Sequence, residues 1–374
     1  MAILKSYKFR IYPNETQKIL LEKHFGATRF IWNTFLSKRK KSYLEEKKNL
    51  TYYDNCKLLT YFKKVEGFEW LNEINSQSLQ ASLQDLDTAY GNFFKKQSKF
   101  PKFKSKHSPN HSFRCPQRVT LKENKLIIPK FKEGIKIKIS KKISGKILYA
   151  TISKTSTEKY FIAILSENKH IQLPPVKKEI GIDLGIKNLA ICSDGKIIEN
   201  IKTTKKYSKR LKYQQRQLSK KEKGSNKRIL QRKKVALVHE KIKNVRTDHL
   251  HKASHSIISE NQTIIIENLN VKGMIKNPHL AKSISDASWY EFSRQLEYKS
   301  NWNNRNLIKI DRWFPSSKMC NACGFINEKL TLADRKWICP KCKTVLDRDL
   351  NASKNILKQG LKILSGSGVE SDIK

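Results

Sequence analysis

The stretch KEIGIDLGIKNLAICSDGKIIEN, residues 178–200, decides the fold. Its apolar runs predict two strands joined by tight turns, with Asp183 among apolar neighbours in the first strand. A second run, TIIIEN at residues 263–268, is short and continuously apolar, which is typical of a strand buried on both faces. Glu267 stands at its carboxyl end. Because open α/β sheets place their active sites at the carboxyl ends of strands, these two acids are candidates for one site.

The third candidate acid lies in KTVLDRDLNASKNIL, residues 343–357, where Asp347 and Asp349 are one residue apart before an expected helix. Spacing alone does not choose between them. Three carboxylates from separate elements can hold two divalent metals about 4 Å apart, which activate a water and stabilise the leaving oxygen of a phosphodiester. A hairpin with an Asp, a buried strand ending in Glu and a late helix with an Asp form an RNase H-like arrangement.

Each acid also has a purely structural interpretation. Asp183 can be a turn aspartate, and Glu267 can simply be exposed where its strand ends. Asp349 can be the N-cap of the last helix, because Asp is among the preferred capping residues. An N-cap can also bind metal, so the two interpretations of Asp349 do not exclude each other.

Four cysteines form two Cys-x2-Cys pairs, separated by 15 residues, within MCNACGFINEKLTLADRKWICPKCK, residues 319–343. Four thiolates at this spacing can surround Zn²⁺ tetrahedrally, and four protein ligands leave no open position for substrate. The sequence therefore predicts a structural zinc site, against the alternatives of two disulfides or coincidental burial. The predicted ligands are Cys320, Cys323, Cys339 and Cys342.

The charge of the chain indicates its class of partner. Its 374 residues include 77 Lys and Arg against 33 Asp and Glu, a net charge of +44. A compact fold with this charge repels itself unless a polyanion is bound, and nucleic acid is the expected polyanion. An anionic membrane is the weaker alternative, because the charge is spread along the whole chain rather than gathered in an amphipathic anchor.

The cellular location is predicted to be the cytoplasm. The sequence contains no apolar run long enough for a transmembrane helix, and its N-terminus lacks the apolar segment of a signal peptide. The three remaining cysteines are isolated, so the pattern is that of a reducing compartment rather than of a disulfide framework.

The N-terminal half predicts two kinds of structure. Residues 5–12 alternate between apolar and basic side chains, which indicates a half-buried strand that ends at Pro13. Asn14 and Gln17 resemble the start of a helix, and two helices are expected after it within a helical block over residues 14–98. Short alternating runs such as IKIKIS follow, and they predict a small antiparallel barrel that the N-terminal strand can complete.

Taken together, the motifs resemble the TnpB family of transposon-encoded RNA-guided nucleases, which are related to type V CRISPR effectors. The matching stretches follow the family order over about residues 5–360 and include YKFRIYPNETQ, TRFIWNTFL, LQDLDTAYGNFF, FPKFKSKH, GIDLGIKNLA, IIIENLNVKGM, WFPSSKMCNACG, CPKC and DRDLNASKNIL.

The resemblance implies a multidomain α/β protein with an RNase H-like (RuvC) nuclease core, a zinc-ribbon insert, a helical recognition lobe and a small antiparallel wedge barrel. The implied boundaries are 1–13 and 105–177 for the wedge barrel, 14–104 for the recognition lobe, 178–316 and 344–365 for the nuclease, 317–343 for the zinc-binding insert and 366–374 for a disordered tail.

The resemblance also implies roles for the acids. The last catalytic acid of the family is the Asp of an Asp-x-Asn motif, which here is Asp349 followed by Asn351. Asp183 and Glu267 match the other two catalytic positions. Asp347 then becomes a supporting residue, bonded to Arg348 or to the turn.

The implied activity is RNA-guided DNA cleavage. The protein would bind a guide RNA from the transposon end, one protein per guide, read a short motif beside the target, and cut double-stranded DNA with Mg²⁺ or Mn²⁺. Its implied location is a prokaryotic cytoplasm, in association with the nucleoid. The alternatives are an RNA-guided DNA-binding repressor that does not cut and a transposase that joins strands.

Three residues are candidate nucleic-acid contacts. Gln80 matches a family position on the recognition helix that faces the motif duplex, and Tyr53 is its expected neighbour. Arg246 is a candidate phosphate contact within the basic segment 204–260, which would line the channel of the guide–target heteroduplex. Burial, capping or a solvated helix face are the alternatives for these positions.

Overall fold

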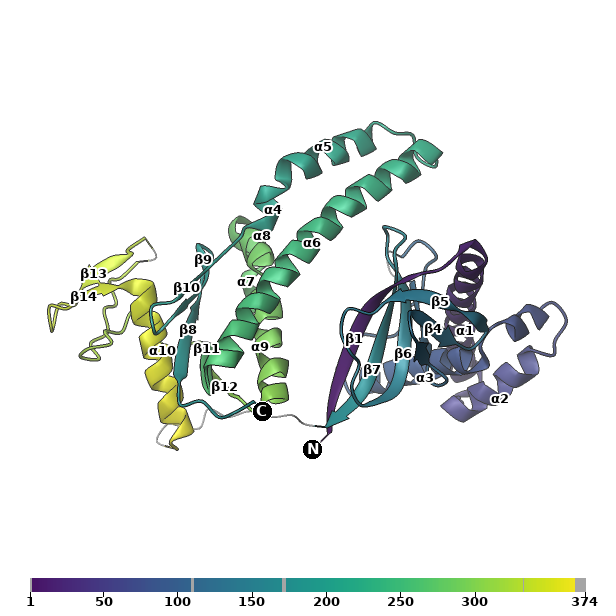
Figure 1. Cartoon of the computed structure of the whole chain (residues 1–374), viewed down its shortest axis with the longest axis horizontal. Helices are drawn as coiled ribbons and strands as arrows, with labels where there is room; N and C mark the ends of the chain where they lie inside the picture. The colour runs from purple at the N-terminus through teal and green to yellow at the C-terminus, as the bar shows by residue number, and fades with distance from the viewer. Residues whose placement is uncertain (1, 109–110, 170–172, 332, 367–374) are drawn as a thin grey trace. The chain divides into compact units, whose positions relative to one another are not determined.

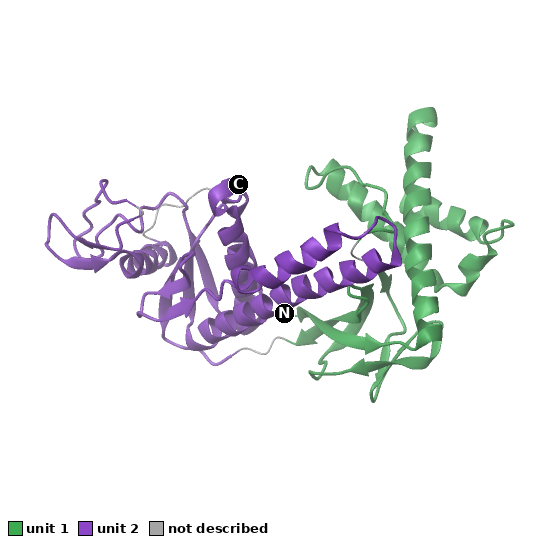
Figure 2. Ribbon diagram, turned by 90° about the horizontal axis from the view of Figure 1, so that it is seen from above, with its two compact units in different colours: residues 1–169 green, residues 170–374 purple. Residues whose placement is uncertain are grey.

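The computed structural model describes residues 2–108, 111–169, 173–331 and 333–366. The chain divides into two compact units, unit 1 over residues 1–169 and unit 2 over residues 170–374 (Figure 2). Except for Gly366, the tail predicted to be disordered lies outside the described residues. Within these ranges, no helix is long and apolar enough to cross a membrane.

Unit 1 contains a seven-stranded antiparallel sheet in the order β2-β6-β7-β1-β5-β4-β3 (Figure 1). Phe113 near one edge of the sheet and Leu126 near the other belong to the same buried cluster, so the sheet curls around one core. The predicted alternation is present in β5, where Ile135 and Ile137 are buried and Lys136 is exposed. The strands are β1 (Ala2–Tyr12), β2 (His111–Cys115), β3 (Thr120–Lys122), β4 (Lys125–Ile128), β5 (Phe131–Lys138), β6 (Lys146–Lys154) and β7 (Tyr160–Lys169).

Helices fill the interval between β1 and β2. The prediction of two helices directly after Asn14 is wrong, because a single helix of 32 residues stands there. Its start is as predicted: Asn14 Oδ1 accepts from Gln17 N at 2.8 Å, and Gln17 Oε1 accepts from Asn14 N at 3.1 Å. Gly26 within it does not interrupt the helix, since one glycine costs only about 1 kcal/mol. The helices are α1 (Glu15–Glu46), α2 (Tyr52–Phe62), the 3-10 helix η1 (Glu69–Glu73) and α3 (Ser76–Phe94).

Unit 2 contains a five-stranded mixed sheet in the order β10-β9-β8-β11-β12. β8, β9 and β10 form an antiparallel meander, whereas β11 lies parallel to both β8 and β12. The first strand of the predicted hairpin, β8, is therefore the neighbour of the predicted buried strand, β11. The carboxyl ends of these two parallel strands share one edge of the sheet. The strands are β8 (Glu179–Leu184), β9 (Asn188–Cys192), β10 (Ile197–Glu199), β11 (Thr263–Glu267) and β12 (Asn306–Ile310).

Helices cover both faces of this sheet. Apolar residues of α6, α8 and α9 pack with those of β8 and β11 on one face, and α10 covers the other (Figure 1). The helical stretch of the basic segment is interrupted near residues 223–226, where α5 has ended and Ser225 caps α6. The helices are α4 (Thr203–Lys206), α5 (Ser208–Ser219), α6 (Asn226–Glu260), α7 (Val271–Met274), α8 (Pro278–Ala287), α9 (Trp289–Asn303) and α10 (Arg348–Leu364).

Two glycines let α10 approach the sheet closely. A Cβ atom on Gly181 would lie 2.2 Å from Ser353 O, and a Cβ atom on Gly360 would lie 2.4 Å from the side chain of Ile265. No other residue type fits either position without a shift of the backbone. The first glycine of GIDLG thus sets the distance between β8 and the helix that carries Asp349.

A short hairpin, β13 (Lys336–Ile338) and β14 (Val345–Asp347), precedes α10. β14 pairs with β13 as far as Asp347, four residues past the predicted end of the zinc-binding insert at Lys343. It continues directly into α10, so the insert and the nuclease core meet without a linker.

Candidate active site and zinc site

The edge of the sheet in unit 2 brings two of the predicted acids together. Asp183 lies near the end of β8 and Glu267 ends the parallel neighbour β11. Both side chains are half-buried. The pKa of Asp183 is raised to about 7. Burial is the largest cause, and the negative charges of Glu267 and Asp349 contribute to the rise. Glu267 and Asp349 therefore both lie near enough for their charges to act on Asp183.

Glu267 is oriented by a serine that sequence reasoning missed. Ser316 Oγ donates to Glu267 Oε1 at 2.5 Å, and Ser316 is itself buried. Burial raises the pKa of Glu267, while this hydrogen bond partly opposes the rise by favouring the charged carboxylate. Ser316 lies in the WFPSSK stretch, which marks it as part of a motif but not as the partner of an acid 49 residues earlier.

The helix cap at the start of α10 is Asp347, so the alternative that Asp349 is only the N-cap does not hold. Asp347 Oδ1 accepts from the backbone amides of Asp349 at 3.1 Å and Leu350 at 2.9 Å. The helix begins at Arg348, one residue earlier than Asp349. Asp349 therefore stands in the first turn, where the helix dipole favours a carboxylate, and its side chain is left for other contacts.

Two arginines hold the carboxylate of Asp349. Arg348 donates to Oδ1 from Nε at 3.0 Å and from Nη2 at 2.8 Å, and Arg335 Nη1 donates to Oδ2 at 3.0 Å. Of the two expectations for Asp347, a bond to Arg348 or to the turn, the contact with the turn is confirmed by the amides of Asp349 and Leu350. Arg335 comes from the insert just before β13, so the insert contributes a side chain to this cluster.

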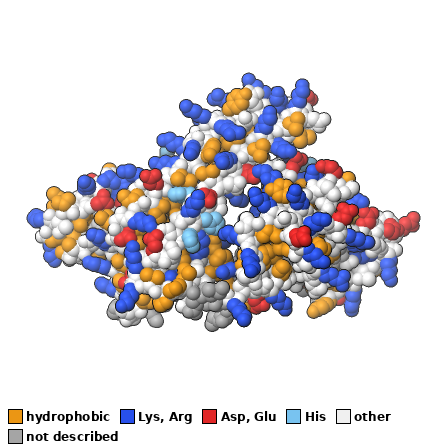
Figure 3. Space-filling view, in the orientation of Figure 1, with side chains coloured by type: hydrophobic (Ala, Val, Ile, Leu, Met, Phe, Trp, Pro, Cys, Tyr) orange, Lys and Arg blue, Asp and Glu red, His pale blue; other side chains and the backbone are white. Residues whose placement is uncertain are grey.

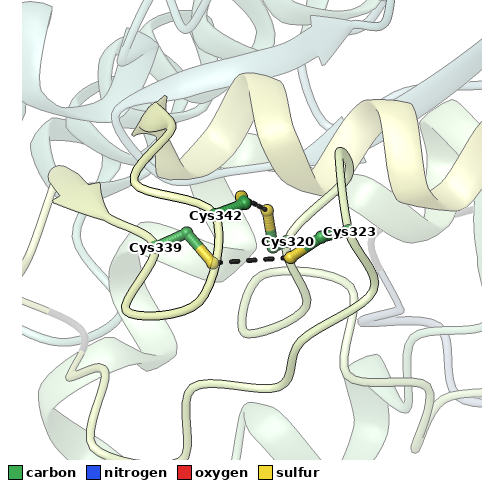
Figure 4. Close-up of side chains that lie close together, drawn as sticks. All are labelled: Cys320, Cys323, Cys339 and Cys342. Atoms are coloured by element: carbon green, nitrogen blue, oxygen red, sulfur yellow. Dashed lines mark hydrogen bonds between the residues drawn. The ribbon is translucent and has the colours of Figure 1, made fainter.

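The four predicted zinc ligands converge in the insert (Figure 4). Their sulfur atoms all lie within 4.8 Å of one another, with 3.6 Å between Cys320 and Cys342 and also between Cys323 and Cys339. Disulfides have a sulfur–sulfur distance near 2 Å, so these pairs are not bonded. Sulfurs bound tetrahedrally to zinc at about 2.3 Å lie roughly 3.8 Å apart, so the arrangement fits Zn²⁺.

Asparagines of α10 hold the segment of the first cysteine pair against the helix. Asn351 donates to Met319 O at 2.6 Å and accepts from Asn321 N at 2.9 Å. Its side-chain amide therefore contacts the backbone on both sides of Cys320. Asn355 donates to Met319 O at 2.6 Å and to Ser316 O at 2.8 Å. The Asn of Asp-x-Asn therefore has a structural contact here: it holds the zinc-binding loop against the helix that carries Asp349.

Known proteins resemble the chain over most of its length. A protein of Streptomyces pristinaespiralis named "Putative RNA-guided DNA endonuclease" is 38% identical to the chain, over 96% of this chain and 90% of its own length. The chain belongs to the TnpB family. The Escherichia coli K12 protein named "Putative RNA-guided DNA endonuclease InsQ" is 32% identical over 99% of this chain and 96% of its own length.

Family models match three parts of this TnpB-family chain. They are described as "Helix-turn-helix domain" over residues 1–48, "Probable transposase" over residues 162–278 and "Cas12f1-like, TNB domain" over residues 289–356. A solved Cas12f1–sgRNA–target DNA complex has a TM-score of 0.58 at 14% identity, and the match covers 95% of this chain and 98% of that one. At this identity the likeness shows a shared fold alone, and it shows it over nearly the whole chain.

The predicted nucleic-acid contacts of the TnpB-family chain have different surroundings. Gln80 on α3 and Tyr53 on α2 are exposed, Tyr53 to 75%. Arg246 on α6 is half-buried, and its Nη1 donates to Ser285 O at 3.2 Å and to Asp286 Oδ1 at 3.5 Å. A phosphate contact by any of them stays a prediction, and Arg246 already has an acidic partner.

Proposed function

We propose that this TnpB-family chain is an RNA-guided, metal-dependent DNA endonuclease of a transposon. The observation that carries the proposal is the position of Asp183 and Glu267 on neighbouring parallel strands, with Asp349 near enough for its charge to act on Asp183, in a chain similar over nearly its whole length to proteins named as such endonucleases. The repressor and transposase alternatives are outcomes of the tests below.

Divalent metal ions fit the acidic cluster. A half-buried Asp183 whose pKa is raised to about 7, with the charges of Glu267 and Asp349 acting on it, is a typical surrounding for a bound cation. In the structure only the four cysteines, among the described residues, bring three or more ligand atoms within 4.8 Å of one another. Asp183, Glu267 and Asp349 would hold Mg²⁺, or Mn²⁺ in its place, after Asp349 gives up part of its contact with Arg335 and Arg348.

When bound, such metals supply an activated water and neutralise the charge that develops on the leaving oxygen of the phosphodiester. The chain's own residues orient the ligands. Ser316 holds Glu267 through its hydroxyl, and Asn355 holds the backbone of Ser316. Arg348 and Arg335 hold Asp349. Zn²⁺ on the four cysteines would keep the loop of Met319 in place against α10.

The remaining parts of the chain carry the partners in this proposal. The sheet of unit 1 would form the wedge barrel and the helices α1 to α3 the recognition lobe, where Gln80 and Tyr53 would face the motif duplex. Lys and Arg side chains are spread over both units (Figure 3), as binding of a guide RNA and a DNA target requires. Sequence recognition would then pass to base pairing between guide and target.

The decisive experiment is to purify the protein with its co-expressed transposon end and to sequence the bound RNA. An RNA from the flank of the gene that directs Mg²⁺-dependent cutting of a matched DNA supports the proposal. Asp183→Asn should abolish cutting and leave RNA binding intact. DNA that is bound but uncut by the unaltered protein would favour the repressor, and joined DNA ends would favour the transposase.

A further inference from the structure

Three lysines of unit 2 surround a pocket of about 280 Å³ near the strand that carries Asp183. Lys202, Lys205 and Lys282 line it, together with the polar side chains of Asn200, Ser283 and Asp286. Its positive groups belong to two separate segments, the turn that leads into α4 and the first turns of α8. The proposed function assigns no role to this pocket.

The pocket adjoins the loop that leaves the candidate active site. Ile186, which forms part of its wall, is the third residue after Asp183. Asn200 Nδ2 donates to Ile186 O at 2.8 Å, and Trp289 Nε1 donates to Gly185 O at 3.3 Å. The residues around the pocket thus fix the loop at the carboxyl end of β8, on the same edge of the sheet as the acids.

A buried acid holds the lysine-bearing turn in place. Asp286 accepts from Thr203 Oγ1 at 3.0 Å, from Thr204 Oγ1 at 2.8 Å and from Thr204 N at 3.0 Å. Arg246 Nη1 lies 3.5 Å from the same carboxylate and offsets its charge. The one acid in the wall is therefore already paired, and the three ammonium groups leave the pocket positive.

Lys202 occupies a backbone conformation that L-residues rarely adopt. Its φ is 41° and its ψ is 52°, in the left-handed region, and its amide donates to Asn200 Oδ1 at 3.1 Å. This conformation costs a residue other than glycine roughly 1–2 kcal/mol. Glycine would therefore be accepted at this position without strain.

We propose that the pocket binds one phosphodiester of the DNA strand that enters the active site. This inference rests on the proposed nuclease function and adds to it a contact that holds the strand beside Asp183. The volume of the pocket suits one phosphate with its sugar, and three ammonium groups suit its charge. No aromatic side chain among the described residues lines the pocket, so it would position the strand without reading its sequence.

The test combines protein variants with chemically altered DNA. The pocket variant carries Lys202→Gly and Lys282→Ala, in which glycine removes the charge and accepts the backbone conformation of Lys202. The matched control carries Lys354→Ala and Lys362→Ala, which remove two charges from the exposed side of α10. Cleavage rates are measured at saturating DNA with a single neutral methylphosphonate at successive positions around the cut.

The expected result is a coupling between pocket and phosphate. One methylphosphonate position should slow the unaltered and control proteins about tenfold, as loss of a charge-assisted contact does. On ordinary DNA, the pocket variant should cut about tenfold more slowly than the unaltered protein. That methylphosphonate should then slow the pocket variant little further. Equal rates for the pocket and control variants, or a methylphosphonate effect that persists in full in the pocket variant, would overturn the inference.

A second measurement separates this inference from the nuclease proposal. If the unaltered ribonucleoprotein cuts no DNA, the proposed function fails, and binding of a single-stranded oligodeoxynucleotide by the full chain still tests the pocket. Several-fold weaker binding by the pocket variant than by the control variant supports the pocket. Equal affinities of the two variants would refute it.

Discussion

At the scale of single residues, residue type and spacing predicted the cluster of four cysteines and the candidate acids but not the partners of the acids. The four cysteines could be identified because thiolates at this spacing have few other uses. The choice between Asp347 and Asp349 needed the family resemblance, since it depends on the residue at which α10 begins, and such boundaries vary by one or two residues. The contact between Arg335 and Asp349 could not be predicted, because it depends on how the insert folds back.

The two aspartates should respond differently to mutation. Asp349→Ala should abolish cleavage with little loss of stability. Asp347→Ala removes the cap of α10 and should lower the free energy of unfolding by about 1 kcal/mol, with partial activity. Asp347→Ser should restore stability and activity together, because Ser also caps helices. Cleavage assays and thermal denaturation measure both; a stable but inactive Asp347→Ser protein would give Asp347 a direct role in the chemistry.

His24 should make the stability of unit 1 depend on pH. Its Nδ1 donates to Leu20 O at 2.8 Å, so its Nε2 accepts from Asn75 N at 3.2 Å and the ring is neutral. Burial lowers the pKa of His24 below its ordinary value of 6.5. The unfolded state therefore binds more protons in acid, so stability is complete above about pH 6.5 and falls below it, by at most about 1.4 kcal/mol per pH unit.

The check is the free energy of unfolding measured between pH 5 and pH 8. His24→Met should flatten the curve in this range, whereas His107→Gln, at an exposed position, should leave its slope unchanged. An unchanged slope in the His24→Met protein would show that other groups cause the loss of stability in acid.

At the scale of helices and strands, periodicity and end signals predicted most elements. The capping box at Asn14 and the apolar run of β11 are local features, so they can be read from the sequence. The close packing of α10 on β8 is not local. It depends on Gly181 and Gly360 lying opposite residues that are far away in the chain. A glycine inside a strand pattern indicates close approach in general, but not which element approaches.

Gly181→Ala should move α10 away from β8. The added Cβ would lie 2.2 Å from Ser353 O and 2.6 Å from Leu357 N, so the helix must shift. Such overpacking costs about 1–3 kcal/mol, and the shift separates Asp349 from Asp183. We expect both a lower melting temperature and a large loss of cleavage. Gly26→Ala in α1 is the control: its Cβ meets nothing within 4 Å, so it should leave activity intact and add up to about 1 kcal/mol of stability.

Removal of zinc should impair cleavage without touching the acids. Among the described residues of the insert, the buried apolar core beside the cysteines consists of Leu330, Trp337 and Leu346, so a bound metal would supply much of its folding energy. Loss of metal would release the loop that Asn351 and Asn355 hold, and with it the start of α10. Cys339→Ser should lower the zinc content and the cleavage rate together. Full activity in a protein shown by metal analysis to lack zinc would contradict this coupling.

At the scale of the whole molecule, composition indicates the class of partner. It does not predict the order of the strands, which depends on pairing between segments far apart in the sequence. A charge of +44 indicates a polyanion without saying which surface binds it. The sheet of unit 1 joins β1 to β5 and β7, which lie more than 100 residues later in the chain. Local patterns predict such strands but not their order, so the curled sheet of unit 1 needed the structure.

The charge should make the protein depend on its guide RNA for stability. Bound RNA offsets the repulsion among the lysines and arginines, so the ribonucleoprotein should melt at a higher temperature than the free protein. Because release of counterions drives such binding, the increase should shrink as salt rises from 50 mM to 500 mM. Melting curves of both forms measure it, with an unrelated RNA of equal length as the control for charge alone. If the guide raises the melting temperature no more than this control RNA does, the fold recognises only charge. If the increase in melting temperature is unaffected by salt, phosphate contacts do not dominate the binding of the guide.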